Sequence, residues 1–142
     1  MKIDQQYLKD LLIAFEETEG HDTSIDDLKK KGYDVDSSDF IFHMRLLDDN
    51  KLITRIDGEP GFGHLHIQHL NGFKYRWISM PLRLTSNGHD FIDALRQKEV
   101  WNSLKKEFKD VTSIQSLFGI SKGLAAGFAK KKINNLTGLD ID

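Results

Sequence analysis

The spacing of apolar residues over the N-terminal third of the chain predicts three short helices. In each of them apolar side chains recur every three or four residues, so one face of the helix is buried. The first helix should begin after Asp4, which can cap it, and should end near Gly20. Its buried stripe comprises Tyr7, Leu8, Leu11, Leu12 and Phe15.

The second helix is short and ends in a run of cations. It should begin at Thr23 or Ser24 and end before Gly32. Lys29, Lys30 and Lys31 fall at its carboxyl end, where positive charge suits the helix dipole. Its buried residues are Ile25 and Leu28.

The third helix should be capped by Ser37 and run to about Asn50. Asn50 is expected to take the left-handed conformation that ends it. Its buried stripe is Phe40, Met44 and Leu47; His43 lies on the same side and should be a core-edge histidine with a backbone partner.

The segment from Leu52 to Leu84 predicts β-structure. Asn71-Gly72 is its strongest turn signal, because both residues of a tight two-residue loop need positive φ. If these two residues form the loop, the strands pair Leu70 with Phe73, Gln68 with Tyr75, His66 with Trp77 and His64 with Ser79.

Alternation along this hairpin separates two faces. We expect one face to be core at its base and basic near its tip, and the other to be covered by the rest of the chain or by a partner. The first face carries Leu65, Ile67, Ile78 and Met80 at its base and His69, Lys74 and Arg76 near its tip. The second carries His64, His66, Gln68, Phe73, Tyr75 and Trp77.

Two further helices are expected after the hairpin. Thr85 can cap a long fourth helix, Gly88 permits close packing at its start, and its apolar stripe continues to Phe108. A last helix should run from about Ser113 to Lys132, with a frayed tail from Asn134. It contains Gly119, Gly123 and Gly127 on one side. Each glycine costs about 1 kcal/mol of helix propensity, which a close helix–helix contact would offset.

Composition and charge narrow the class of protein. A chain of 142 residues with 39% hydrophobic residues is the size of one ordinary domain, and the absence of cysteine excludes disulfides and thiolate chemistry. Neither a membrane-spanning run nor the apolar core of a signal peptide is visible, so we expect a cytoplasmic protein. Residues 1–71 have a net charge of −7 and residues 72–142 of +5. This asymmetry indicates either a partner with opposite poles of charge or two faces that attract each other within the monomer.

The order of these elements is that of an α+β winged helix-turn-helix domain, with the hairpin as the wing. The stretch from Phe42 to Ile53 resembles the third helix and first strand of winged-helix regulators. The stretch from Leu84 to Arg96, followed by Val100-Trp101 and Lys105, is similar to a bacterial and phage family catalogued as a domain of unknown function, DUF2513. The resemblance implies a phage or prophage origin and supplies no catalytic residues. It suggests a winged-helix domain over 1–110 and a helical extension over 111–142.

DNA binding is the default use of this layout, although the third helix is a poor reader of bases. Its exposed side offers only Arg45 as a donor, while Asp39, Asp48 and Asp49 would repel phosphate. We therefore expect a non-enzymatic, phage-type transcriptional regulator that contacts phosphates. The residues expected to bind DNA are Lys29, Lys30, Lys31, Arg45, His69, Lys74 and Arg76.

The alternative is a protein-interaction module, a homodimer or a host-factor binder, that does not bind DNA. Aromatic anchors and the glycine face would form its contacts. The residues expected to bind a partner are His66, Phe73, Tyr75, Trp77, Gly119, Gly123 and Gly127. His64 and His66 have the spacing of a zinc-binding pair, with Asp57 or Glu59 as a third ligand, but the signal is weak and we expect neither metal nor cofactor.

Overall fold

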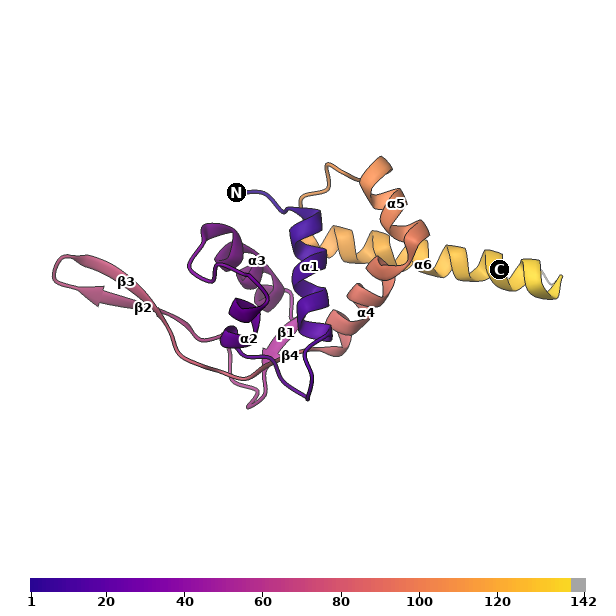
Figure 1. Cartoon of the computed structure of the whole chain (residues 1–142). Helices are drawn as coiled ribbons and strands as arrows, with labels where there is room; N and C mark the ends of the chain where they lie inside the picture. Colours follow the sequence, from indigo (N-terminus) through magenta and orange to yellow (C-terminus); the bar gives the residue numbers. More distant parts are fainter. Residues whose placement is uncertain (139–142) are drawn as a thin grey trace.

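The computed structural model describes residues 1–138, apart from the side chains of His69 and Phe73, and has a mixed α+β fold. Figure 1 shows a helical body from which a β-hairpin projects at one end and the last part of α6 at the other. The helices are α1 (Gln5–Glu16), α2 (Ile25–Lys30), α3 (Ser38–Asp49), α4 (Ser86–Arg96), α5 (Lys98–Glu107) and α6 (Ile114–Thr137). The strands are β1 (Ile53–Arg55), β2 (His64–His69), β3 (Gly72–Trp77) and β4 (Leu82–Leu84).

The first three helices form, and each has an expected cap, but α1 ends at Glu16, before the predicted end near Gly20. The side chains of Asp4, Ser24 and Ser37 each accept a hydrogen bond from a backbone N–H in the first turn. The prediction that Asn50 takes the left-handed conformation after α3 is wrong. Lys51 takes it, with φ 56°, whereas Asn50 has φ −92°. The Asn50 amide instead donates to the Leu46 carbonyl at 2.8 Å and satisfies one of the last carbonyls of the helix.

A short antiparallel pair, β1 with β4, joins the body to the hairpin; we call it the clasp, residues 53–55 and 82–84. Thr23 adds one bridge to Leu82, through N–O distances of 2.7 and 3.0 Å. Beside the clasp, the Thr85 N–H donates to the Leu52 carbonyl at 2.9 Å. A Cβ on Gly88 would lie 2.2 Å from that same oxygen, so the close packing predicted at Gly88 is confirmed.

The hairpin forms, but in a register different from the predicted one. His64 pairs with Trp77, His66 with Tyr75 and Gln68 with Phe73, so each residue of β2 pairs two positions nearer the turn on β3 than expected. Gly72 has φ 119°, while Asn71 is not among the described residues with positive φ. Asn71-Gly72 therefore does not form the central pair of the turn, and Leu70-Asn71 occupies the loop. Because the shift is an even number, both faces keep their predicted members.

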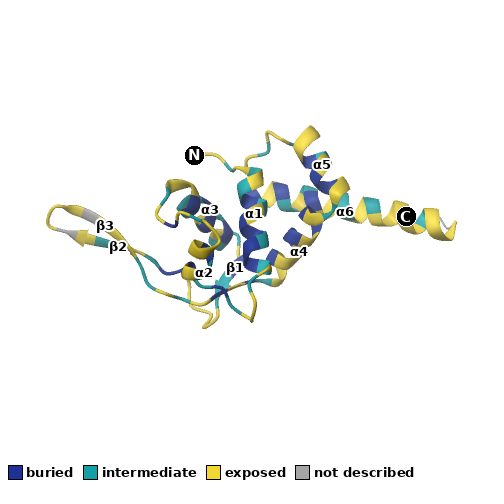
Figure 2. Ribbon diagram, in the orientation of Figure 1, coloured by how far each residue is buried: buried dark blue, intermediate teal, exposed yellow. Residues whose placement is uncertain are grey.

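The base of the hairpin is not core, contrary to expectation. Leu65 is exposed, and Ile67, Ile78 and Met80 are only half-buried. The buried cluster lies instead among the helices and the clasp, where Phe40 and Phe91 are its largest fully buried side chains. The reason is distance: the hairpin projects beyond the helices that would have to cover this face (Figure 2).

The predicted long fourth helix is two helices, broken at Gln97. Gln97 has ψ 124°, which is extended backbone. The buried residues of α4 and those of α5 would lie roughly 180° apart on one continuous helix at about 100° per residue. The break turns both stripes towards the same core. The buried side chains are Phe91, Ile92 and Leu95 in α4, and Val100, Trp101 and Leu104 in α5.

α6 begins after the predicted Ser113 cap but runs farther than expected, to Thr137, and ends at Gly138 with φ 71°. The prediction of a frayed tail from Asn134 is therefore wrong for residues 134–137, which are helical. Ile114 and Leu117 join the same buried cluster as the rest of the body. The three glycines predicted to pack closely have nothing within 4 Å of a Cβ, so no close contact forms around them in this chain; they are Gly119, Gly123 and Gly127.

We predict opposite effects for alanine at two helical glycines. Gly88→Ala forces a methyl group onto the Leu52 carbonyl and should lower the free energy of unfolding by about 3 kcal/mol. Gly123→Ala enters open space and should raise it by about 1 kcal/mol, the difference in helix propensity. Urea denaturation of both variants tests this. Equal effects would mean that the close approach at Gly88 is not formed.

Candidate nucleic-acid interface

The projecting hairpin, which we call the arm (β2, β3 and the Leu70-Asn71 turn), is mostly exposed (Figure 2). Its segment has an unusual composition: residues 60–89 contain no aspartate or glutamate. The segment holds three Lys or Arg residues, Lys74, Arg76 and Arg83. This absence of acidic residues is visible in the sequence. The net charges of residues 1–71 and 72–142 do not show it, because the division falls inside the segment.

The outer face of the arm consists of Leu65, Ile67, Lys74 and Arg76. Leu65 pairs with Arg76, and Ile67 with Lys74. Lys74 and Arg76 are exposed, two positions apart on β3, so both cations lie on one side of the ribbon. His69, predicted to lie on the same face, has a side chain outside the described part of the structure.

The inner face of the arm starts from Trp77, which fixes the arm to the body. The indole ring lies 5.9 Å from the rings of both Phe40 and Phe62, measured between centroids. Its Nε1–H donates to the Asp36 carboxylate at 3.3 Å. The half-buried Trp77, predicted as a partner anchor, therefore makes its described contacts within the chain.

Farther along the inner face, three rings form a ladder. Tyr75 stacks on His64 at 5.0 Å with 6° between the ring planes, and on His66 at 4.9 Å with 20°. The Tyr75 ring is thus nearly parallel to both imidazoles and close to each of them. Phe73 pairs with Gln68 farther out, but its side chain lies outside the described residues.

Arg45, on the exposed side of α3, is electrostatically coupled to this inner face. Burial lowers the pKa of His64, the Arg45 and His66 charges lower it further, and Asp36 opposes them. The carboxyl end of α3 has the opposite character. There, burial and the neighbouring Asp49 raise the pKa of Asp48. Arg45 is therefore a cation whose charge disfavours protonation of His64, on a helix that ends in carboxylates.

The lysines at the end of α2 do not extend the basic surface of the arm. Lys30 and Lys31 line a groove together with Glu17, Glu19 and Asp27. Lys31 also borders a second groove that contains Asp34 and other carboxylates. The described residues predicted to bind DNA are thus divided among three places: the outer face of the arm with Lys74 and Arg76, the exposed side of α3 with Arg45, and the carboxyl end of α2 with the three lysines.

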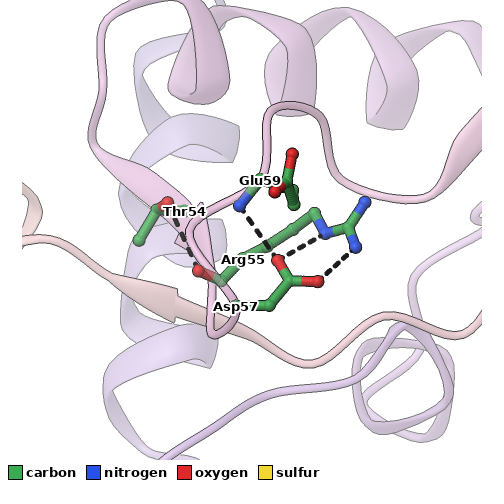
Figure 3. A network of polar contacts seen from close by, with 4 residues as sticks. All are labelled: Thr54, Arg55, Asp57 and Glu59. Atoms are coloured by element: carbon green, nitrogen blue, oxygen red, sulfur yellow. Dashed lines mark hydrogen bonds and ion pairs between the residues drawn. The ribbon is translucent and has the colours of Figure 1, made fainter.

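Of the two candidate third metal ligands, Asp57 has other partners for its carboxylate. The Arg55 guanidinium binds the Asp57 carboxylate through two contacts, and that carboxylate also accepts from the Glu59 N–H at 3.0 Å (Figure 3). The Arg55 interaction lowers the pKa of Asp57. Within residues 1–138, as far as the structure describes them, no three His, Asp or Glu side chains are grouped to hold a metal ion.

His43 is buried, and its predicted role as a core histidine with a backbone partner is confirmed. The Asp4 N–H donates to Nε2 at 3.0 Å, and Nδ1 lies 2.7 Å from the Asp39 carbonyl. Because a carbonyl can only accept, the proton lies on Nδ1 and the ring is neutral. This histidine ties the start of α1 to α3.

Comparison with known proteins gives a family but no activity. No curated protein and no solved structure matches the chain. None of the helices in the described part of the chain is long and apolar enough to cross a membrane. A family model described as "Hypothetical protein (DUF2513)" matches residues 2–115, which include α1 to α5 and the whole arm. The chain therefore belongs to the DUF2513 family.

Proposed function

We propose that this protein is a non-enzymatic winged-helix protein that binds duplex DNA through its arm and serves as a DNA-associated regulator. Three helices followed by a β-hairpin have the order of that fold, with α2 and α3 as the helix-turn-helix and the arm as the wing. The sheet supports this assignment, because Thr23, between α1 and α2, pairs with β4, which pairs with β1.

The observation that carries the proposal is the charge of the arm. It projects from the body, no carboxylate occurs between residues 60 and 89, and Lys74 and Arg76 are exposed on one face. Such a surface is attracted to a phosphate backbone whatever its sequence. The exposed side of α3, by contrast, offers Arg45 among carboxylates, which is too little for reading base edges. The arm therefore supplies affinity, and α3 little specificity.

The second candidate function is protein binding without DNA. It is favoured by the apolar exposure of the arm, where Leu65 is 38%, Leu70 106% and Tyr75 57% exposed. Side chains of this kind commonly anchor protein interfaces. Salt dependence separates the two functions, because phosphate binding weakens steeply with salt and apolar docking does not.

We predict that reversing the charge of the outer face weakens duplex binding. Lys74→Glu/Arg76→Glu removes two phosphate contacts, so the slope of log K against log salt should fall in magnitude by roughly 1.8, about 0.9 per contact. Fluorescence anisotropy with a mixed-sequence duplex over a salt series measures this.

The matched control is Lys130→Glu/Lys131→Glu, the same charge change near the far end of α6. It should have the smaller effect. Equal weakening by both variants would place the interface elsewhere than on the arm. Failure of the unaltered protein to bind duplex at low salt would favour the protein-binding alternative.

We also predict that the arm must be held by Trp77 to bind well. Trp77→Ala removes the contacts with Phe40 and Phe62, which should lower local stability by about 2 kcal/mol. Amide hydrogen exchange in β2 and β3 should accelerate and duplex affinity should fall, although no charge has changed. Leu70→Ala, at the exposed turn, is the control. Unchanged exchange in the arm would show that Trp77 does not anchor it.

A further inference from the structure

The tip of the arm carries a leucine that packs against nothing in the described chain. The last pair of the ribbon joins His69 to Gly72, so Leu70 and Asn71 are the two residues of the loop. Figure 1 shows this loop at the outer end of the projecting hairpin. Leu70 is 106% exposed and lies outside the hydrophobic core cluster. Its side chain therefore adds no packing to the described fold.

The turn itself does not call for a leucine at this position. Two-residue hairpin loops favour Gly, Asn and Asp, because these residues tolerate the required backbone conformations or hydrogen-bond to the backbone. An apolar side chain on a projecting hairpin also favours unwanted pairing between molecules. Residues that break such a local rule without a gain for the fold are commonly functional. Leu70 is therefore a candidate contact residue for a ligand.

The charges behind the tip indicate which ligand covers this leucine. Lys74 and Arg76 are exposed on β3, two and four positions behind Gly72, and residues 60–89 contain no aspartate or glutamate. At about 3.3 Å per residue along a strand, Lys74 lies about 7 Å behind the turn, which is close to the groove depth of about 7.5 to 8.5 Å in duplex DNA. When the tip reaches the base pairs, Lys74 is therefore level with the phosphates at the rim of the groove.

We propose that Leu70 is a wedge that the arm inserts between two base pairs, and that this wedge makes the protein prefer DNA in which a base step is already unstacked. The proposal rests on the proposed DNA-binding function and names the form of DNA that the arm selects. Apolar side chains are frequently inserted in this way by proteins that bend DNA. Lys74 and Arg76 hold the phosphate backbone, and Leu70 contacts the exposed base faces.

The preference follows from the cost of unstacking. In a matched duplex, opening a base step costs about as much as burying a leucine side chain gains, so Leu70 adds little to the affinity there. A mismatched pair is easier to unstack, so the cost falls while the gain from burial remains. Two duplexes of equal length carry equal numbers of phosphates, so the cations of the arm contribute equally to both. The difference in affinity therefore reports on the wedge.

The experiment compares two duplexes of equal length, one fully matched and one with a central cytosine–cytosine mismatch, at the same salt concentration. The unaltered protein should bind the mismatched duplex about tenfold more tightly. Leu70→Ala should lose this preference, and Leu70→Met, which keeps a long apolar side chain, should retain most of it. The matched control is Leu136→Ala, which removes the same side chain from an exposed position on α6 and should leave the preference unchanged.

A second measurement detects the insertion itself. A fluorescent adenine analogue beside the mismatch emits more strongly when it is unstacked from its neighbours. Saturation with the unaltered protein should raise this emission, because the Leu70 side chain takes the place of a neighbouring base. Saturation with Leu70→Ala should leave the emission near that of free DNA.

The outcomes separate the two proposals. Equal affinity for the matched and mismatched duplexes, or a preference that survives in Leu70→Ala, overturns the wedge and leaves the proposed function standing. Emission that the unaltered protein does not change at saturation has the same meaning. No binding to either duplex overturns the proposed function and the wedge that rests on it.

Discussion

The position of the arm depends on one close backbone approach, between Gly88 and the carbonyl oxygen of Leu52. Only three residue pairs connect β1 to β4, and the chain between these strands leaves the body to form the arm. The Leu52 carbonyl accepts the Thr85 N–H at 2.9 Å, and the Thr85 hydroxyl donates to the Lys51 carbonyl at 2.6 Å. The end of α3, both strands of the clasp and the start of α4 therefore meet within a few ångströms. A side chain larger than hydrogen at Gly88 would separate them.

The distribution of charge follows the shape of the molecule. Residues 60–89 and 111–138 contain no acidic residue, and they include the two elements that project, the arm and α6. The acidic residues of the described chain therefore lie on the body and on the loops beside it. A polyanion that approaches is repelled by the carboxylates of the body and attracted by the arm, so the field of the protein orients the encounter before any contact forms. The same arrangement explains why α3, which belongs to the body, is poorly suited to lie in a DNA groove.

Local patterns predicted the local structure well, because caps and amphipathic stripes are set by neighbouring residues. Ser24, Ser37 and Thr85 cap the helices that their positions indicate. Features set by distant residues were missed. α4 stops at Gln97, and the stop turns two apolar stripes towards one core. The pairing of the hairpin was missed for a local reason, because Gly72 has the positive φ but belongs to β3 and not to the Leu70-Asn71 loop. The base of the arm was predicted to be buried, but the helices that would have to cover it do not reach it. Of the site, the two faces were predictable from alternation, but the neighbourhood of Arg45 and His64 was not.

The two-stranded arm has exposed strand edges that can pair with another molecule, and its cations oppose this pairing. In a ribbon of two strands the outer edge of each strand is unpaired, and such an edge can accept a strand from another molecule. Exposed Leu65 and Leu70 would add apolar contact to that pairing. Lys74 and Arg76 place like charges wherever two arms meet, which opposes fibre-like stacking. The charge on which the proposed DNA binding rests therefore also keeps free molecules apart, and whatever neutralises it without covering the strand edges would promote self-association.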